Sequence, residues 1–145
     1  MTAAGTTLQL VVFSLGDEEF AAPVTSVQEI IEHRQPRTVA SEVPWLRGVI
    51  SLRGRIIPVC DLATRLGTDR APRSESKVVV VEAGGQLAGV VVDAVSEVLT
   101  IDADLIEELP VAQDGIIEGI ARVDDRLIVL LNLDGVLAEA PVPAA

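Results

Sequence analysis

Hydrophobic and polar positions in this chain change over short distances, with the two-residue alternation and brief apolar runs typical of β-strands. Glycine, proline and paired polar residues interrupt the runs and predict turns. The predicted strand segments are Leu8–Leu15, Glu19–Ala22, Gly48–Leu52, Arg55–Cys60, Lys77–Glu82, Leu87–Leu99, Ile116–Val123 and Arg126–Leu131, and Val27–Glu32 is a further apolar segment. The predicted turns within hairpins are Gly16-Asp17, Arg53-Gly54, Gly84-Gly85 and Asp124-Asp125. A mainly β fold is therefore expected.

Helical signals are short and few. Asp61 stands where a helix N-cap belongs, directly before Leu62–Leu66, and Gly67 supplies the stop. Acidic residues early in Asp102–Leu109 predict another short helix there. The ends of the chain, residues 1–7 and 139–145, are predicted to be flexible tails.

An internal repeat relates the two halves of the chain. Residues 48–67 align without gaps on residues 119–138 at an offset of 71 positions, and VQEII at 27–31 matches VSEVL at 95–99 at an offset of 68. The identical pairs in the longer match are Gly48/Gly119, Arg55/Arg126, Ile57/Ile128, Leu62/Leu133 and Leu66/Leu137. The repeat predicts two similar β units, roughly residues 8–67 and 77–138, which share one core because each is too small to bury a large core alone.

Composition supports strands and narrows the class of protein. The 145 residues include 22 Val, 11 Ile and 16 Leu but only 2% aromatic residues, and β-branched side chains favour sheets. No apolar run approaches the roughly 20 residues needed to cross a bilayer, and the N-terminus has no pattern of a secretory signal. The single cysteine, Cys60, and the single histidine, His33, cannot form a disulfide or a Cys/His zinc site. We expect a cytoplasmic protein without a metal or cofactor.

Charge is unevenly distributed along the chain. The formal charge of -11 divides into -4 for residues 1–31, +4 for residues 32–77 and -11 for residues 78–145. The basic segment is a conceivable contact for nucleic acid, but two Phe, one Trp and no Tyr offer little base stacking, and the acidic surroundings repel a polyanion. An acidic protein surface is the preferred partner of the basic segment, and nucleic acid is not expected.

Catalytic motifs are missing from the sequence. Cys60 lies in the apolar run IIPVCDL, where a thiol is usually inert, and His33 is the one candidate general base. Neither glycine-rich phosphate-binding pattern occurs. The chain is predicted not to be an enzyme, and a small Cys/His enzyme is kept only as an alternative.

Four segments together resemble a known family. LVVFSLGDEEFAAPVTSVQEII, PWLRGVISLRGRIIPVCDL, GVVVDAVSEVL and GIARVDDRLIVLLNLDGVL are similar, in order and spacing, to the CheW-like domain of bacterial chemotaxis proteins, over roughly residues 8–138. The resemblance implies two five-stranded SH3-like β-barrels around a shared hydrophobic core, with a few short helices. It implies a non-catalytic adaptor that couples the cytoplasmic tips of methyl-accepting chemotaxis receptors to the regulatory domain of the histidine kinase CheA, recruited to receptor arrays at the inner membrane without inserting into it. A parallel sensory or motility pathway is the alternative.

The resemblance also implies contact residues. Carried over by motif, the receptor-binding residues are Val27, Glu29, Gly48, Arg53, Val78 and Val98. The valines would bury an apolar stripe of a helical partner, and Arg53 at the rim would form a forked hydrogen bond with a carboxylate. The kinase-binding candidates are Val111, Asp124 and Asp125. Ser51 replaces the Asn usual in the family and is assigned no role. Because equivalent turns of the repeat carry Arg53 and Asp124, we expect them to face partners of opposite charge.

Overall fold

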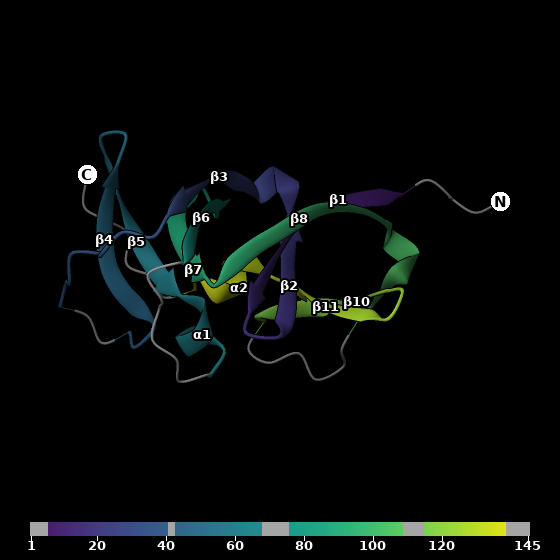
Figure 1. Ribbon diagram of the computed structural model, residues 1–145. Helices are drawn as coiled ribbons and strands as arrows, with labels where there is room; N and C mark the ends of the chain where they lie inside the picture. The colour runs from purple at the N-terminus through teal and green to yellow at the C-terminus, as the bar shows by residue number, and fades with distance from the viewer. Residues whose placement is uncertain (1–5, 41–42, 68–75, 109–114, 139–145) are drawn as a thin grey trace.

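The computed structural model describes residues 6–40, 43–67, 76–108 and 115–138, and it confirms the mainly β fold (Figure 1). The strands are β1 (Thr7–Leu15), β2 (Glu18–Pro23), β3 (Val27–Glu32), β4 (Leu46–Leu52), β5 (Arg55–Asp61), β6 (Lys77–Ala83), β7 (Gln86–Val92), β8 (Ala94–Asp102), β9 (Ile106–Glu107), β10 (Ile117–Val123) and β11 (Arg126–Leu131). The helices are α1 (Leu62–Arg65), α2 (Leu133–Val136) and the 3-10 turns η1 (Val24–Ser26) and η2 (Ala103–Leu105).

The strands form two sheets that exchange hairpins. The six-stranded sheet has the order β8-β1-β2-β11-β10-β9, and the five-stranded sheet has the order β3-β6-β7-β5-β4. Each sheet therefore contains strands from both halves of the sequence, joined by the parallel pairs β2–β11 and β5–β7. This arrangement corrects the predicted division into units of residues 8–67 and 77–138. The sequence repeat marks equivalent elements, but hydrogen bonding places the two hairpins of each half in different sheets.

Both sheets curve so that their two edges approach each other. In the five-stranded sheet, the chain after β3 reaches β4 through a bridge between Arg37 and Val49, with N–O distances of 2.8 and 2.9 Å. In the six-stranded sheet, β8 leads through η2 into β9, which pairs with β10. The six-stranded sheet has one strand more than the five expected, because the two-residue strand β9 completes it. Both sheets thus have the predicted barrel-like form.

Three clusters of buried apolar side chains explain why strands such as β1 and β6 are apolar at successive positions. Leu10 and Val12 of β1 belong to a cluster made only by the six-stranded sheet, whereas Val11 and Phe13 belong to a cluster that both sheets share. The same alternation divides β6 between a cluster made only by the five-stranded sheet and the shared cluster. Strands buried on both faces need continuous apolar runs, and each fully buried large side chain contributes about 2 kcal/mol. The predicted shared core is confirmed.

The internal repeat recurs in the backbone. A β-bulge interrupts the β4–β5 pairing between Leu46 and Gly48, and an equivalent bulge interrupts β10–β11 between Ile117 and Gly119. The helix that follows each hairpin begins at a side-chain cap, Asp61 for α1, as predicted, and Asn132 for α2.

Three local predictions differ from the structure. Leu87–Leu99 is two strands rather than one, because the Asp93 carboxylate accepts a hydrogen bond of 2.6 Å from the Gly16 N–H of the β1–β2 turn and the chain bends there. Asp102–Leu109 is not a helix over its described part: strand pairing of β8 and β9 outweighs the acidic signal and leaves only η2. Thr7 lies in β1 rather than in a tail; residues 1–5 and 139–145 lie outside the described residues.

Candidate protein-contact site

An exposed ion pair joins the two edges of the five-stranded sheet. Arg53, in the β4–β5 turn, donates from Nε to Oε2 of Glu29 at 2.9 Å and from Nη2 to Oε1 at 2.8 Å. Glu29 lies on β3, and β3 and β4 are the outer strands of this sheet. The hydrogen bond from Arg53 lowers the pKa of Glu29 and raises that of the Arg53 guanidinium. The Arg53 side chain is 73% exposed, so its outer face remains open to a partner.

The backbone beside this pair is fixed from the β3 side. Arg34 donates from Nη1 to the carbonyl oxygen of Ser51 at 2.9 Å, and Arg37 forms the bridge to Val49. Gly48 is buried with a φ of +145°, and a Cβ there would lie 2.1 Å from the carbonyl oxygen of Arg37. The structure therefore gives Gly48 a packing role, and its place in a contact surface stays a prediction. Only glycine allows the two segments to approach so closely.

The three candidate valines have different surroundings. Val98 is 57% exposed on β8, the edge strand of the six-stranded sheet. Val27 is half-buried and packs against the shared core. Val78 is 1% exposed and packs in the apolar cluster of the five-stranded sheet, and its contact with a partner stays a prediction. The alternation of β6 directs Val78 inward, and the unbroken run of valines concealed that direction.

One apolar candidate was missed. Ile30 on β3 is 43% exposed and follows Glu29 directly. The match of VQEII with VSEVL makes Ile30 the equivalent of Val98, so the repeat itself contained the signal. β3 and β8 both border the shared core, since Val27 and Val95 pack against it. The surface candidates that the structure retains are thus divided between the outer strands of two sheets that meet at one core.

The second turn of the repeat carries the opposite charge. Asp124, with a φ of +54°, and Asp125 are exposed in the β10–β11 turn, at the position where the first copy has Arg53 with a φ of +52°. Beneath them, Arg126 donates to both carboxylate oxygens of Glu19 at 2.9 and 2.8 Å and to Glu97 at 2.7 Å. These contacts lower the pKa of Glu19 and tie β11 to β2 and β8, a structural role. Val111 lies outside the described residues.

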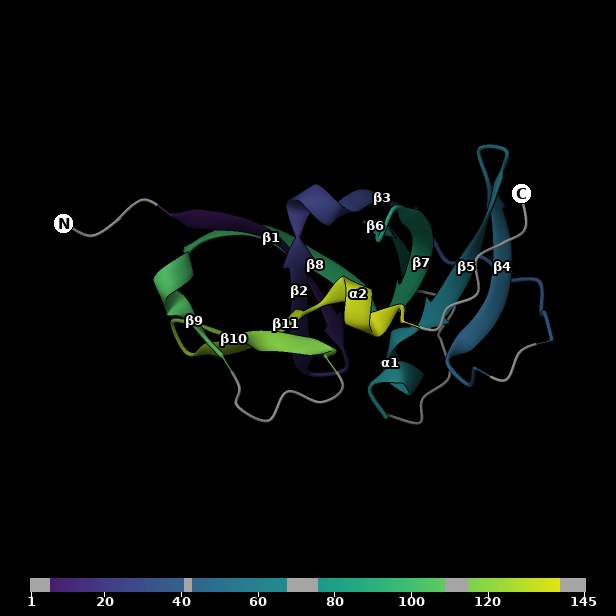
Figure 2. The same cartoon turned by 180° about the vertical axis from the view of Figure 1, so that it is seen from behind.

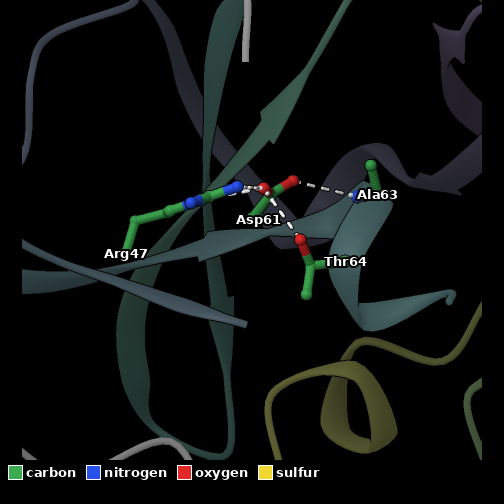
Figure 3. A network of polar contacts seen from close by, with 4 residues as sticks. All are labelled: Arg47, Asp61, Ala63 and Thr64. Atoms are coloured by element: carbon green, nitrogen blue, oxygen red, sulfur yellow. Dashed lines mark hydrogen bonds and ion pairs between the residues drawn. The ribbon is translucent and has the colours of Figure 1, made fainter. Parts of the chain in front are cut away.

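A buried carboxylate organises the first helix. Asp61 is 2% exposed and accepts hydrogen bonds from Arg47 Nε at 2.8 Å, from Thr64 Oγ1 at 3.0 Å and from the Ala63 N–H at 3.1 Å (Figure 3). Arg47 Nη2 also pairs with this carboxylate. The network fixes α1 against the bulged part of β4. Sequence reasoning found the cap but not Arg47.

An arginine at the end of α1 connects the two halves of the chain. Arg65 donates from Nε to the carbonyl oxygen of Val136 and from Nη2 to that of Gly135, both at 2.9 Å. Its guanidinium also lies over the ring of Trp45, 5.3 Å from the centroid, a cation–π distance. Arg65 therefore holds the two short helices together.

The residues considered for catalysis are not brought together. Cys60 is 1% exposed in the shared core, and burial raises the pKa of its thiol, which disfavours a nucleophilic thiolate. His33 directly follows β3, where its backbone N–H donates to the backbone carbonyl oxygen of Ser76 at 3.2 Å. Within the described ranges no three His, Cys, Asp or Glu side chains cluster as metal ligands would. None of the helices in those ranges has the length and apolarity to span a membrane.

Two interleaved curved sheets, with an exposed ion pair and exposed apolar side chains on their outer strands, define a β module suited to protein contacts. The family model of the CheW-like domain matches residues 9–140, and the chain belongs to this family. Its members are non-catalytic scaffold proteins, so the chain is not an enzyme, and the Cys/His alternative is dropped.

Individual relatives agree over most of the chain. The probable chemotaxis protein CheW of Rhizobium etli is 32% identical over 142 residues, covering 94% of this chain and 92% of that protein. The crystal structure of the scaffolding protein TtCheW from Thermoanaerobacter tengcongensis superimposes with a TM-score of 0.86 at 34% identity, covering 93% of this chain and 95% of that chain. Protein PilI of Pseudomonas aeruginosa is 36% identical over 84 residues, covering 57% of this chain and 47% of that protein.

Proposed function

We propose that this protein is an adaptor that couples the cytoplasmic tips of methyl-accepting chemotaxis receptors to the regulatory domain of the histidine kinase CheA. Membership of the CheW-like family and similarity to a scaffolding protein over nearly its whole length support this role. The observation that carries it is the exposed Arg53–Glu29 pair, because it places a charged, partly open group directly beside Ile30, an exposed apolar side chain of the outer strand β3.

The proposed receptor surface combines that pair with three apolar side chains. Ile30 and Val98 are exposed and Val27 is partly so, which suits the apolar stripe of a helical partner. Arg53 donates to Glu29 from Nε and from one N–H of Nη2. Its remaining N–H groups can donate to a carboxylate of the partner. Val78 and Gly48 contribute from beneath, by filling the sheet and by allowing its edges to close.

The proposed kinase contact uses the other turn. Asp124 and Asp125 are exposed at the tip of the β10–β11 hairpin and would meet a basic surface, whereas Arg53 would meet an acidic one. A chain with opposite charges at equivalent turns favours head-to-tail association with a homologous domain over pairing of like ends. Val111 stays a prediction for this contact.

Reconstitution of kinase activity tests both contacts. CheA is assayed with a receptor signalling fragment, with and without this protein, and receptor binding is followed separately by co-sedimentation. The Arg53→Glu variant should lose receptor co-sedimentation and kinase activation, whereas Arg122→Glu, a control that reverses another exposed, ion-paired arginine, should keep receptor binding. The double variant Asp124→Asn, Asp125→Asn should keep receptor binding and lose affinity for CheA. Unchanged receptor binding by Arg53→Glu would refute the receptor assignment.

A parallel sensory or motility pathway is the second candidate. The similarity to protein PilI, whose name is not that of a chemotaxis protein, favours keeping it. Deletion of this chain followed by separate assays of swimming chemotaxis and surface motility distinguishes the two: loss of surface motility alone would assign it to the parallel pathway.

A further inference from the structure

A cleft that serves neither proposed contact lies between the β6–β7 turn and α2, the yellow helix near the middle of Figure 2. Its volume is about 330 Å³. Pro58, Ala83 and Ala88 form part of its apolar wall, which Leu137 extends, and Gln86 and Asp134 supply its polar groups. None of these residues belongs to the proposed receptor or kinase surface.

The repeat explains why the cleft exists. The β6–β7 hairpin has the same register as the β1–β2 hairpin, since Ala83 pairs with Gln86 as Leu15 pairs with Glu18. The offset of 68 makes Leu15 the equivalent of Ala83 and Phe20 the equivalent of Ala88. In the first copy these bulky side chains are 8% and 5% exposed and belong to the shared core. The second copy has alanine at both positions, and the volume they leave is open.

On the side of the cleft formed by α2, the second copy also lacks an apolar group that the first copy has. The offset of 71 makes Asp134 the equivalent of Ala63, which is 5% exposed and part of the shared core, and Leu137 the equivalent of Leu66. Asp134 is exposed, and its carboxylate lies about 4 Å from the position a Cβ would take on Gly84. In the first copy Leu15, Phe20 and Ala63 belong to the shared core, whereas the second copy has two alanines and a carboxylate at the equivalent positions.

These groups select a long apolar chain that ends in a cation. The described contacts give neither the Asp134 carboxylate nor the Gln86 amide a side-chain hydrogen bond or ion pair within the chain. Pro58 and Leu137 can cover the methylene stem of such a ligand. The net charge of -11 on residues 78–145 attracts cations to this half. A planar guanidinium can donate to the carboxylate and to the amide oxygen together.

We propose that this cleft binds an arginine side chain presented by a segment of a partner protein. The proposal is independent of the receptor and kinase contacts, because it uses different residues and a different turn. It makes the β6–β7 turn and α2 a third contact region of the molecule.

Titration of the isotope-labelled full chain, followed by its amide NMR spectrum, tests the proposal. The probe is a blocked glycyl-arginyl-glycine peptide, compared with the same peptide carrying norleucine and with guanidinium ion alone. The arginine peptide should shift the amides of Gly84, Gly85 and Ala88 in a saturable manner, and the other two probes should not. Equal shifts with norleucine, or saturation by guanidinium but not by the peptide, would overturn the proposal.

Three variants define the site. Asp134→Asn should weaken binding of the arginine peptide on the order of two- to fivefold, as expected for one exposed ion pair. Ala83→Leu, which restores the residue of the first copy at a half-buried position, should abolish the saturable shifts while the rest of the spectrum stays folded. Asp104→Asn is the matched control, an exposed carboxylate of the same half outside the cleft and outside both proposed contacts, and should bind as the parent does. Equal weakening by Asp104→Asn and Asp134→Asn would show general charge attraction and overturn the proposal.

Discussion

Replacement of Asp61 by alanine should cost this protein about 3 kcal/mol of unfolding free energy. The carboxylate makes three kinds of contact: it caps α1 at the Ala63 N–H, accepts from the Thr64 hydroxyl and pairs with Arg47. Loss of the cap costs about 1 kcal/mol, and loss of the hydroxyl contact about 1 kcal/mol. The Arg47 side chain is 38% exposed and can return to water, so its charged hydrogen bonds add only about 1 kcal/mol.

Replacement of Asp61 by asparagine should cost far less. An asparagine oxygen can still cap the helix, as Asn132 does for α2, where it accepts from the Asp134 N–H at 3.1 Å and the Gly135 N–H at 3.4 Å. The new amide can donate to the Thr64 hydroxyl, so only the charged contact with Arg47 is lost. The expected cost is about 1 kcal/mol.

Urea unfolding of Asp61→Ala, Asp61→Asn and Asn132→Ala, followed by circular dichroism with a constant m-value, measures these costs. Asn132→Ala is the matched control, because it removes the same cap from the second copy, where no arginine of the described residues contacts the cap, and it should cost about 1 kcal/mol. The expected order is Asp61→Ala well above the other two. Equal costs for Asp61→Ala and Asp61→Asn would refute the separate contribution of the cap.

Two further predictions concern acid stability and the exchange of hairpins. Because Arg126 lowers the folded-state pKa of Glu19 below its ordinary value of 4.5, Glu19 stabilises the fold above that value, and this contribution is lost as the pH falls through the lower folded pKa. Glu19→Gln should therefore flatten the loss of stability below pH about 4.5, as measured by urea unfolding at a series of pH values; a profile parallel to the parent would contradict this. Fragments 1–67 and 77–145 should each be unfolded alone and regain the native amide spectrum when mixed, because each sheet needs strands from both; a native-like spectrum from either fragment alone would contradict the role of the exchange.

The sequence predicted the strands well because strand formation leaves a local signal. Two-residue alternation and turn residues fix where Gly48–Leu52 or Ile116–Val123 can be extended, whatever they pair with. The break at Asp93 was missed because its cause is a hydrogen bond to Gly16, 77 positions away. The exchange of hairpins was missed for the same reason: pairing between distant strands leaves no mark in the local pattern.

The candidate site was predictable only in part. Family resemblance named Glu29 and Arg53, and the structure joins them across 24 positions of sequence, a pairing that spacing alone does not indicate. Resemblance did not show that Val78 faces inward, because every neighbour in its run is also apolar. Arg47 had no signal at all, since the repeat aligns it with Glu118, a residue of opposite charge, and so conceals the partner of Asp61.

The differences between the two copies, rather than their common backbone, carry the proposed functions. Equivalent turns hold Arg53 and Asp124 at nearly the same φ, so the change of charge alters the partner and not the fold. Equivalent hairpins place Phe20 in the core and Ala88 beside a cleft, so a loss of side-chain volume opens a site without a change of register. A module with two identical copies would present each surface twice. Because these substitutions fall on exposed turns and on the rim of the shared core, each copy can contact a different partner while the strands that hold both together stay the same.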